Sequence, residues 1–281
     1  MGTGVVADEH GGGLLGGAAV RTGGAVPTAA PDDAGCPQPW YPGSVAPMPE
    51  PLIPSTGLGV LHLFCAVTPQ TDRSAIETAV KAAEADDLQI VPVATLGHKA
   101  DVAFMALGAD VWRLRAFQTA LAAAGLDLVD SYVSLTELSE YAQGLPEAMA
   151  QARLYPQLPP EGMTAWCFYP MSKRRDPGQN WFALPFDDRK ALMHEHGASG
   201  RKFAGRIVQL ITGSAGVDDY EWGVTLFAQK PDDLKEVVYT MRFDTASTEY
   251  AEFGPFVTGA VGSLDEVLDA VGITGTPMRD R

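Results

Sequence analysis

One order of elements occurs twice along the chain, and this repetition constrains the fold more than any other feature of the sequence. In the first segment, hydrophobic periodicity predicts strands and helices in the order β-α-β-β-α-β, over residues 60–67, 71–87, 88–97, 101–108, 109–125 and 126–138. The same order returns over residues 165–170, 186–204, 205–214, 220–228, 231–244 and about 253–261, before a last helix over 263–272. This order is typical of the ferredoxin-like unit. Two such units predict an α+β fold, a dimeric α+β barrel with the helices outside a shared core.

Local signals place the boundaries of this repeat. Thr71 is expected to cap the first helix, and Gly125 is expected to end the second. The segment before residue 57 is rich in Gly, Ala and Pro, so it buries too little apolar surface to offset its ordering entropy. The predicted organisation is therefore a disordered tail, an N-terminal half, a linker with a short helical piece, and a C-terminal half, over residues 1–56, 57–140, 141–163 and 164–281.

Composition limits the classes of protein that the chain can belong to. No run of 18 apolar residues occurs, so no membrane insertion is expected, and the N-terminus lacks the basic and apolar regions of a secretion signal. Cys36, Cys65 and Cys167 form no CxxC or CxxH pattern, which favours reduced thiols in a cytoplasmic protein. The net charge of −15 argues against nucleic acid as the main partner.

The charge distribution is more informative than the total. From Lys173 to Arg206 there are eight basic and four acidic residues, so this stretch carries 8 − 4 = +4 and the rest of the chain −15 − 4 = −19. We call these eight residues the basic island: Lys173, Arg174, Arg175, Arg189, Lys190, Arg201, Lys202 and Arg206. The island is interpreted either as a solvated helix face or as a binding site for an anion.

Three polar side chains within predicted elements are candidates for chemistry. His194 and His196 lie two residues apart on a helix, so they point about 200° apart and cannot both bind one metal. His196 follows the apolar positions and is expected to face inward, either as a hydrogen-bonded core residue or as the single axial ligand that a haem iron requires. Gln209 shares a strand face with two isoleucines, so it is either a hydrogen-bonded core amide or a polar group above an open coordination position.

Tyr169 and its neighbours form the second group of candidates. Pro170 is expected to end the strand directly after Tyr169, which would leave the tyrosine at the rim of the sheet. A buried tyrosine is usually an amphipathic packing residue, but beside a redox metal it can lose an electron and a proton. Lys173 and the adjacent arginines are suited to bind carboxylates. No GxSxG, Walker, GxGxxG or paired-cysteine motif supports another chemistry.

Several motifs together resemble a known family. CFYPMSKRR, LMHEHG, VQLITGSAGVDDYEWGVTLF and MRFDTASTEYAEFGPF are similar to the coproheme decarboxylases of the chlorite dismutase-like superfamily, in the order and spacing of that family, over about residues 57 to 272. The resemblance implies a cytoplasmic enzyme that decarboxylates two propionates of Fe-coproporphyrin III (coproheme) with hydrogen peroxide. Haem b would form through a monovinyl intermediate. The iron of the substrate would serve as the redox centre, in the C-terminal half.

The resemblance also implies roles for individual residues. Tyr169 would be the catalytic tyrosine that becomes a radical, and His196 would be the iron ligand. The implied porphyrin contacts are Arg153, Tyr169, Pro170, Met171, Ser172, Lys173, Gln209, Arg242 and Ser247. Four propionates carry up to four negative charges, which suits the +4 of the basic island. No histidine lies between His98 and His194, so the distal histidine that many members use as a base has no counterpart in this chain.

Two alternatives remain at this stage. A chlorite dismutase is expected to carry a distal arginine where this chain has Gln209, and Arg206 is three residues away. A haem-binding α+β barrel without catalysis would keep His196 but would not need Tyr169. The family further implies a homopentamer and a transient contact with the ferrochelatase that supplies coproheme.

Overall fold

A computed structural model describes residues 49–142 and 144–274, so most of the predicted tail lies outside the described residues. Within that predicted tail, residues 49–56 are described. Leu52 is bound to the start of the second helix by two hydrogen bonds. Its N–H donates to the Asp110 carboxylate (3.0 Å), and its carbonyl accepts from the Val111 N–H (3.0 Å). None of the helices in these two described ranges is long and apolar enough to cross a membrane.

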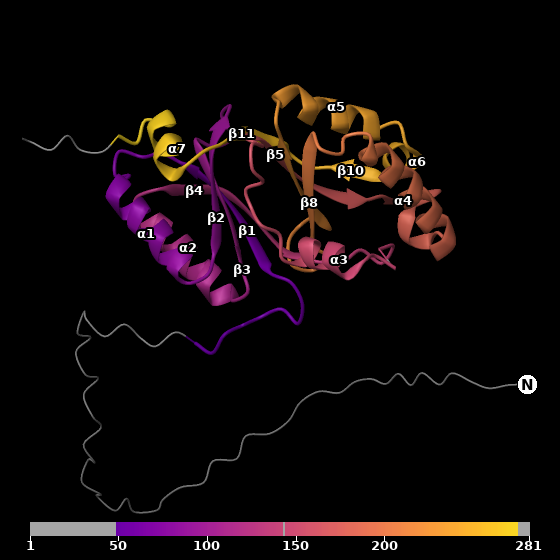
Figure 1. Ribbon diagram of the computed structural model, residues 1–281, viewed down its shortest axis with the longest axis horizontal. Coiled ribbons are helices and arrows are strands. Elements are labelled where there is room, and N and C mark those ends of the chain that lie inside the picture. Colours follow the sequence, from indigo (N-terminus) through magenta and orange to yellow (C-terminus); the bar gives the residue numbers. More distant parts are fainter. Residues whose placement is uncertain (1–48, 143, 275–281) are drawn as a thin grey trace, which may run out of the picture. The chain divides into compact units, whose positions relative to one another are not determined.

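The N-terminal half is a ferredoxin-like unit. Its four antiparallel strands are ordered β4-β1-β3-β2, with two helices on one face (Figure 1). The elements are β1 (Gly59–Ala66), α1 (Arg73–Ala85), β2 (Gln89–Leu96), β3 (Val102–Gly108), α2 (Val111–Ala123) and β4 (Asp127–Thr136). Helix α3 (Glu147–Leu154) follows within the predicted linker.

The C-terminal half repeats the unit with strand order β11-β5-β9-β8. Its elements are β5 (Ala165–Lys173), α4 (Phe186–Arg201), β8 (Ile207–Gly213), β9 (Trp222–Ala228), α5 (Pro231–Met241) and β11 (Val257–Val261). Additions to the unit are β6 (Arg175–Asp176), β7 (Gln179–Asn180), the 3₁₀ turn Trp181–Ala183, α6 (Thr245–Thr248), β10 (Ala251–Phe253) and α7 (Leu264–Ala270).

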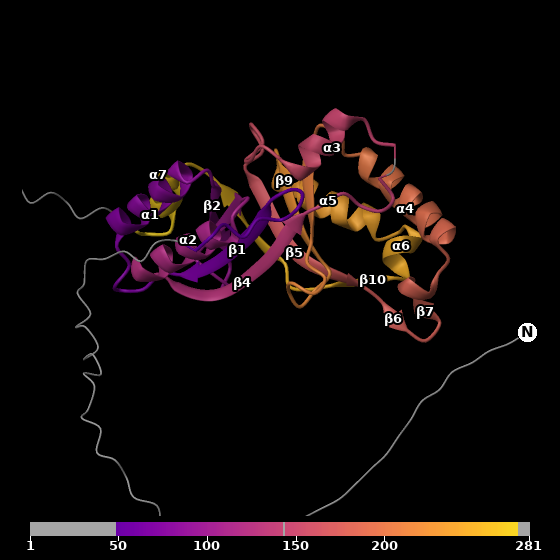
Figure 2. The same ribbon diagram turned by 90° about the horizontal axis from the view of Figure 1, so that it is seen from below.

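The two sheets close into one barrel, which confirms the predicted fold class. Strand β11 pairs with β2, and β4 pairs with β8, as at Thr258↔Leu96 and Leu135↔Gly213. Aromatic and aliphatic side chains from both halves fill the interior, including Phe64, Trp166 and Phe227. Helices α1, α2 and α7 cover the outer face of the N-terminal half, and α4, α5 and α6 lie outside the C-terminal half (Figures 1 and 2).

The helix boundaries need one correction. Asp72, not Thr71, caps α1, because its carboxylate accepts hydrogen bonds from the N–H groups of Ser74 (2.8 Å) and Ala75 (3.2 Å). The Thr71 hydroxyl instead donates to the carbonyl of Gly125 (2.9 Å). Gly125 follows Ala124, the C-cap residue of α2, with φ of +85°, the left-handed conformation that favours glycine after a helix.

Pro170 does not end its strand, so the expectation that Tyr169 lies at the sheet rim is wrong. Strand β5 continues through Pro170 to Lys173, and Pro170 pairs with Gly223 of β9. On the other edge of β5, β10 pairs up to Met171 and β11 pairs from Phe168, so the partner strand is interrupted beside Pro170. Proline lacks a backbone N–H and so cannot donate a hydrogen bond to a neighbouring strand. The interruption lies on the side of β5 to which this N–H would point, so no strand pairing is lost at Pro170.

One buried histidine of the barrel interior makes stability depend on pH. His62 is buried, its Nε2 lies 3.0 Å from the Thr225 hydroxyl, and burial lowers its pKa to about 3. Between pH 6.5 and about 3, the unfolded chain binds a proton at this position and the folded chain does not, so the free energy of unfolding falls as the pH falls. For one group the slope is at most about 1.4 kcal/mol per pH unit. Urea unfolding at pH 7, 6 and 5 is expected to give a shallower slope for His62→Phe, and equal slopes would contradict this assignment.

Candidate functional site

Tyr169 is buried in the middle of β5, on the face that the helices of the C-terminal half cover. Its residue is only 6% exposed, and its ring stacks on Phe256 at 4.4 Å between centroids with 23° between the planes. Phe253 lies against it at 5.8 Å. Burial raises the pKa of Tyr169 above its ordinary value, Cys167 adds to the rise, and Arg242 opposes it. The phenol therefore stays protonated at neutral pH, and its oxidation requires loss of the proton together with the electron.

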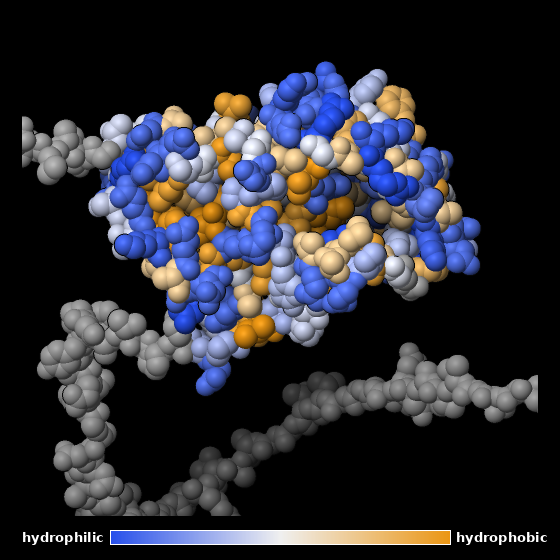
Figure 3. Space-filling model, viewed as in Figure 1, coloured by the Kyte–Doolittle hydropathy of each residue, from blue (hydrophilic) through white to orange (hydrophobic). Residues whose placement is uncertain are grey.

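Gln209 lies on the same sheet face as Tyr169. Directly opposite residues in antiparallel strands share a face. Ile211 of β8 is opposite Val224 of β9, and Val224 is opposite Tyr169 of β5, so Ile211 and Tyr169 share a face. Gln209 is two residues before Ile211 on β8, so its side chain points to the same face. Gln209 is exposed and Ile211 is 45% exposed, so the helices leave this face open over β8. In Figure 3 the surface between α5, α4 and α3 is hollowed and largely hydrophobic.

His196 has one ring nitrogen occupied and the other available. Its Nδ1 lies 2.9 Å from a carboxylate oxygen of Asp244, and its side chain is 24% exposed. The carboxylate can only accept, so Nδ1 carries the proton and the Nε2 lone pair is available to a metal. The Ser247 hydroxyl lies 3.5 Å from the same Nδ1. His194 is exposed on a different face of α4, in agreement with the helical spacing.

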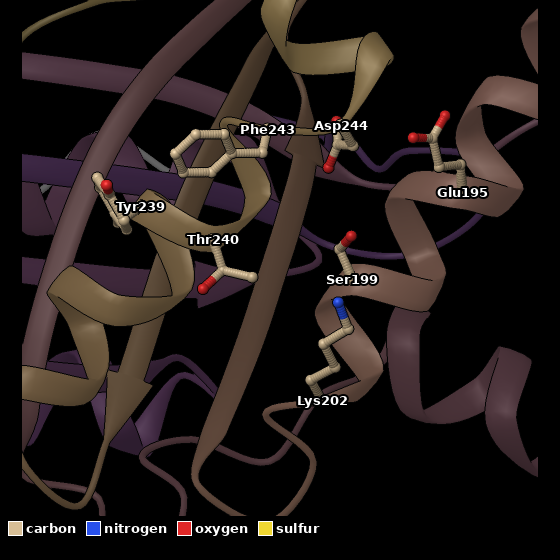
Figure 4. A pocket seen from close by; sticks show the side chains of 7 residues that line it. All are labelled: Glu195, Ser199, Lys202, Tyr239, Thr240, Phe243 and Asp244. Carbon is tan, nitrogen blue, oxygen red and sulfur yellow. The ribbon is translucent and has the colours of Figure 1, made fainter.

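Asp244 is held rigidly enough to orient this ring. It is buried, and its other carboxylate oxygen accepts a hydrogen bond from the Ser247 N–H (3.0 Å) at the start of α6. It also lines a pocket of about 260 Å³ between α4 and α5, together with residues such as Ser199 and Thr240 (Figure 4). The partner of the candidate ligand thus lies at the wall of this groove, with its side chain buried.

Replacing Asp244 by asparagine is expected to weaken iron binding at His196. The amide has nearly the same size as the carboxylate, but it is neutral and can present its NH₂ group to Nδ1, so the preferred ring tautomer is lost. Loss of such a partner typically lowers metal affinity by about 10- to 100-fold. Absorbance titration of the apo-protein with ferric coproporphyrin III measures this change. An affinity equal to that of the unaltered protein would contradict the assignment.

The basic island is not one anion clamp, because several of its cations have partners within the chain. Arg206 binds Asp233 and Glu236, Arg175 binds Glu221, and Arg189 binds Glu140 together with the Tyr141 hydroxyl. Arg174 donates to Gln179 (3.2 Å). Lys190, Arg201 and Lys202 are exposed on or just after α4. The net charge of +4 that the sequence gives this segment is therefore not gathered on one surface that could bind an anion.

Lys173 also departs from the expectation of a direct carboxylate contact. It is only 8% exposed, its ammonium donates to the carbonyl of Ala246 (2.7 Å), and it lies 4.4 Å from the centre of the Trp181 ring. Burial lowers the pKa of Lys173 to about 8, while Asp244 and Glu221 act in the opposite direction. In this arrangement the cation braces α6 rather than facing the open part of the sheet.

The remaining predicted porphyrin contacts differ in how far they are exposed. The Arg242 guanidinium is exposed and lies 4.8 Å from the centre of the Phe253 ring, close to Tyr169. Pro170 is buried, Met171 and Ser172 are half-buried, and the Ser172 hydroxyl accepts from the Glu221 N–H (3.2 Å). Arg153 lies exposed in the last turn of α3, where no ion pair to another described residue holds it.

Sequence reasoning missed Asp244, Phe253 and Phe256. Asp244 precedes α6 as an ordinary helix cap, and nothing in the local pattern indicates that it also binds His196. Phe256 lies inside the strand predicted over about 253–261, and its contact with Tyr169 depends on the interruption between β10 and β11. Both signals are tertiary, so a single sequence without its fold does not contain them.

The donor set fits an iron porphyrin. A neutral imidazole with a free Nε2 is a common axial ligand of haem iron, and an apolar hollow suits the macrocycle. The exposed Gln209 is a polar group and the buried Tyr169 an oxidisable one, and both lie on the sheet face of the same half. Fold and site together define an α+β barrel with the elements of a haem site in its C-terminal half.

Comparison with known proteins agrees with this class. The family model described as Chlorite dismutase matches residues 71–262, and the chain belongs to this family. A coproheme decarboxylase of Staphylococcus carnosus is 46% identical over 177 residues, which are 59% of this chain and 70% of that protein. A second one, of Staphylococcus saprophyticus, is 42% identical over 62% of this chain and 73% of that protein. These matches confirm the resemblance noted in the motifs and the prediction of an oxidoreductase-type enzyme.

Three further relatives bear on the fold and the length of the chain. A protein of Natronomonas pharaonis, described as a candidate heme-binding protein, is 41% identical over 68% of this chain, and the chain spans only 34% of its length. A heme-binding protein of Thermus thermophilus has a solved structure with a TM-score of 0.68 and 33% identity, covering 81% of this chain and 99% of that one. A chlorite dismutase of Candidatus Nitrospira defluvii, at 18% identity and a TM-score of 0.61, shares the fold.

Proposed function

We propose that this chain catalyses the hydrogen peroxide-dependent oxidative decarboxylation of coproheme to haem b, through a monovinyl intermediate. The observation that carries the proposal is the position of Tyr169. It is a buried, protonated phenol on the same sheet face as the open Gln209, in a protein whose helical layer presents His196. A tyrosine so enclosed serves poorly as a general base, because burial disfavours its anion. It is well suited to give up a hydrogen atom to an oxidant and to recover one from a substrate.

Each residue of the site then has a role. His196 binds the iron through Nε2, and Asp244 holds the ring and its Nδ1 proton. Gln209 would present a neutral amide to the bound peroxide, without the fixed positive charge of an arginine. The bound iron supplies the oxidising equivalents of peroxide. The Tyr169 radical takes a hydrogen atom from the carbon β to the propionate carboxylate.

The overall step balances with one peroxide for each propionate. A propionate, one hydrogen peroxide and one proton give a vinyl group, carbon dioxide and two water molecules. One electron and one proton leave as the hydrogen atom that Tyr169 takes, and the second electron is released as the carbon–carbon bond breaks. The two oxidising equivalents of the peroxide take up both electrons, one of them by way of the Tyr169 radical. Two such turnovers convert coproheme to haem b.

Charge near the reacting propionate comes chiefly from Arg242. Its guanidinium is exposed, and it is the cation whose charge acts on Tyr169. The half-buried Met171 and Ser172, the backbone of Pro170 and Ser247 are proposed to line the propionate side. Lys173 is proposed to contribute its charge from behind α6, and Arg153 to reach the porphyrin edge from α3.

Product analysis separates the candidate functions. The apo-protein is loaded with ferric coproporphyrin III and titrated with hydrogen peroxide, and the porphyrins are resolved by chromatography. Monovinyl product followed by haem b is expected. Oxygen release from chlorite without vinyl products would indicate a chlorite dismutase, and binding without either reaction would indicate a haem-binding barrel.

The resemblance supports three further proposals about the environment of the enzyme. The chain is proposed to assemble as a homopentamer, to act in the cytoplasm, and to contact transiently the ferrochelatase that supplies coproheme. Light scattering after gel filtration tests the assembly, and a mass other than five chains would contradict it.

A further inference from the structure

The segment between β10 and β11 is built around Tyr169. Three residues, Gly254 to Phe256, lie opposite two residues of β5, Tyr169 and Pro170, so this segment forms a bulge. The Gly254 N–H donates to the Pro170 carbonyl (2.8 Å), which holds the bulge against β5. The space at Gly254 is tight, because an added Cβ would lie 2.7 Å from both Pro170 and Tyr220.

The bulge places an aromatic residue on each side of its apex against the catalytic ring. Phe256 stacks on Tyr169 at 4.4 Å and 23°, and Phe253 meets it at 5.8 Å and 54°. The Arg242 guanidinium lies over Phe253 at 4.8 Å. On the side of the bulge, Tyr169 thus contacts two rings that neither donate nor accept protons.

The bulge is also anchored from the other half of the barrel. The ammonium of Lys99, on the loop between β2 and β3, donates to the backbone carbonyl of Phe256. This hydrogen bond joins residues 157 positions apart in the sequence. Lys99 is exposed, so its removal leaves no buried charge without a partner.

We propose that Phe256, held by Lys99, is a positioning residue that fixes the orientation of the Tyr169 ring for hydrogen-atom transfer. The proposal rests on the radical role of Tyr169 in the proposed function. Hydrogen-atom transfer requires near contact between the phenol oxygen and the substrate carbon, and small displacements of a reacting group cost large factors in rate. A stacked ring limits rotation of Tyr169 without changing the binding of the porphyrin.

The test compares Phe256→Leu with Phe182→Leu as the control. Leucine keeps an apolar side chain but removes the stack, whereas Phe182 is 48% exposed and lies over Arg175, remote from Tyr169 in the contacts of the chain. In the apo-protein, NMR of ¹³C-labelled tyrosine rings, with Tyr169 assigned by its loss in Tyr169→Phe, reports the rate of ring flips. Flips at Tyr169 are expected to be at least about tenfold faster in Phe256→Leu and unchanged in Phe182→Leu.

The loaded enzyme gives two more readouts. Freeze-quench EPR after peroxide addition is expected to show altered β-methylene proton splittings of the Tyr169 radical, because these splittings follow the ring dihedral. The rate constant kcat is expected to fall by about tenfold with the coproheme Kd unchanged within twofold. Lys99→Ala is expected to show a smaller change in the same direction, and Lys99→Arg, which keeps a donor, is expected to restore it.

The outcomes separate this proposal from the proposed function. If ring-flip rate, splittings and kcat in Phe256→Leu and Lys99→Ala all match those of Phe182→Leu, Phe256 does not position Tyr169. If the unaltered protein forms no vinyl product, the proposed function fails, while the ring-flip rates of the apo-protein still decide whether Phe256 restrains the ring.

Discussion

Replacing Tyr169 by phenylalanine is expected to abolish vinyl products while leaving coproheme binding intact. The substitution removes only the phenol oxygen, and the ring can keep its stack on Phe256. Without that oxygen no hydrogen atom can be taken from the propionate at this position. The amount of vinyl product is therefore expected to stay at the level that forms in a control without protein. Chromatography after peroxide addition measures it.

Tyr132→Phe is the matched control for this variant. Tyr132 is also a buried tyrosine, but it lies in the barrel interior, where its hydroxyl is hydrogen-bonded to Ser214. This variant is expected to lose stability through the missing hydrogen bond and to retain product formation. Haem b formation by Tyr169→Phe at the rate of the unaltered protein would exclude the tyrosine mechanism.

Replacing His196 by alanine is expected to remove the iron ligand, whereas the same change at His194 is expected to leave it. The two histidines lie on one helix, but only His196 is held by Asp244 and half-buried, and His194 is exposed. The affinity for ferric coproporphyrin III is expected to fall by more than the roughly 10- to 100-fold assigned to loss of an orienting partner.

Absorbance and magnetic spectra of the loaded variants identify the ligand. His196→Ala is expected to lose the histidine-ligated high-spin signature and to regain it when imidazole is added, because the free base can enter the space that the side chain leaves. An unchanged spectrum in His196→Ala, or a lost signature in His194→Ala, would place the ligand elsewhere.

The fold could be predicted from sequence because its signals are periodic and local. The strand and helix patterns of each ferredoxin-like unit can be recognised in the sequence. Because the unit occurs twice, closing the two sheets into one barrel buries a face of both. Pro170 shows where such reasoning fails. A proline inside a predicted strand reads as its end, but here the partner strand is interrupted on the side that lacks the donor.

The site could be predicted only in part for a related reason. The residues on single elements, Tyr169, His196 and Gln209, could be named from motifs and strand phase. The partners of the basic island could not, because Glu221, Asp233 and Glu140 approach it from other elements. The buried ammonium of Lys173 likewise depends on α6, a short helix that the sequence pattern did not predict.

The most direct measurement of the central claim follows the carboxyl carbons of the substrate. Ferric coproporphyrin III labelled with ¹³C in its propionate carboxylates is bound to the full chain and treated with hydrogen peroxide, and released carbon dioxide is counted by mass spectrometry beside the porphyrin products. Two labelled carbon dioxide molecules and two consumed peroxides are expected for each haem b, and no labelled carbon dioxide is expected from Tyr169→Phe. Peroxide consumption that bleaches the porphyrin without labelled carbon dioxide would contradict it.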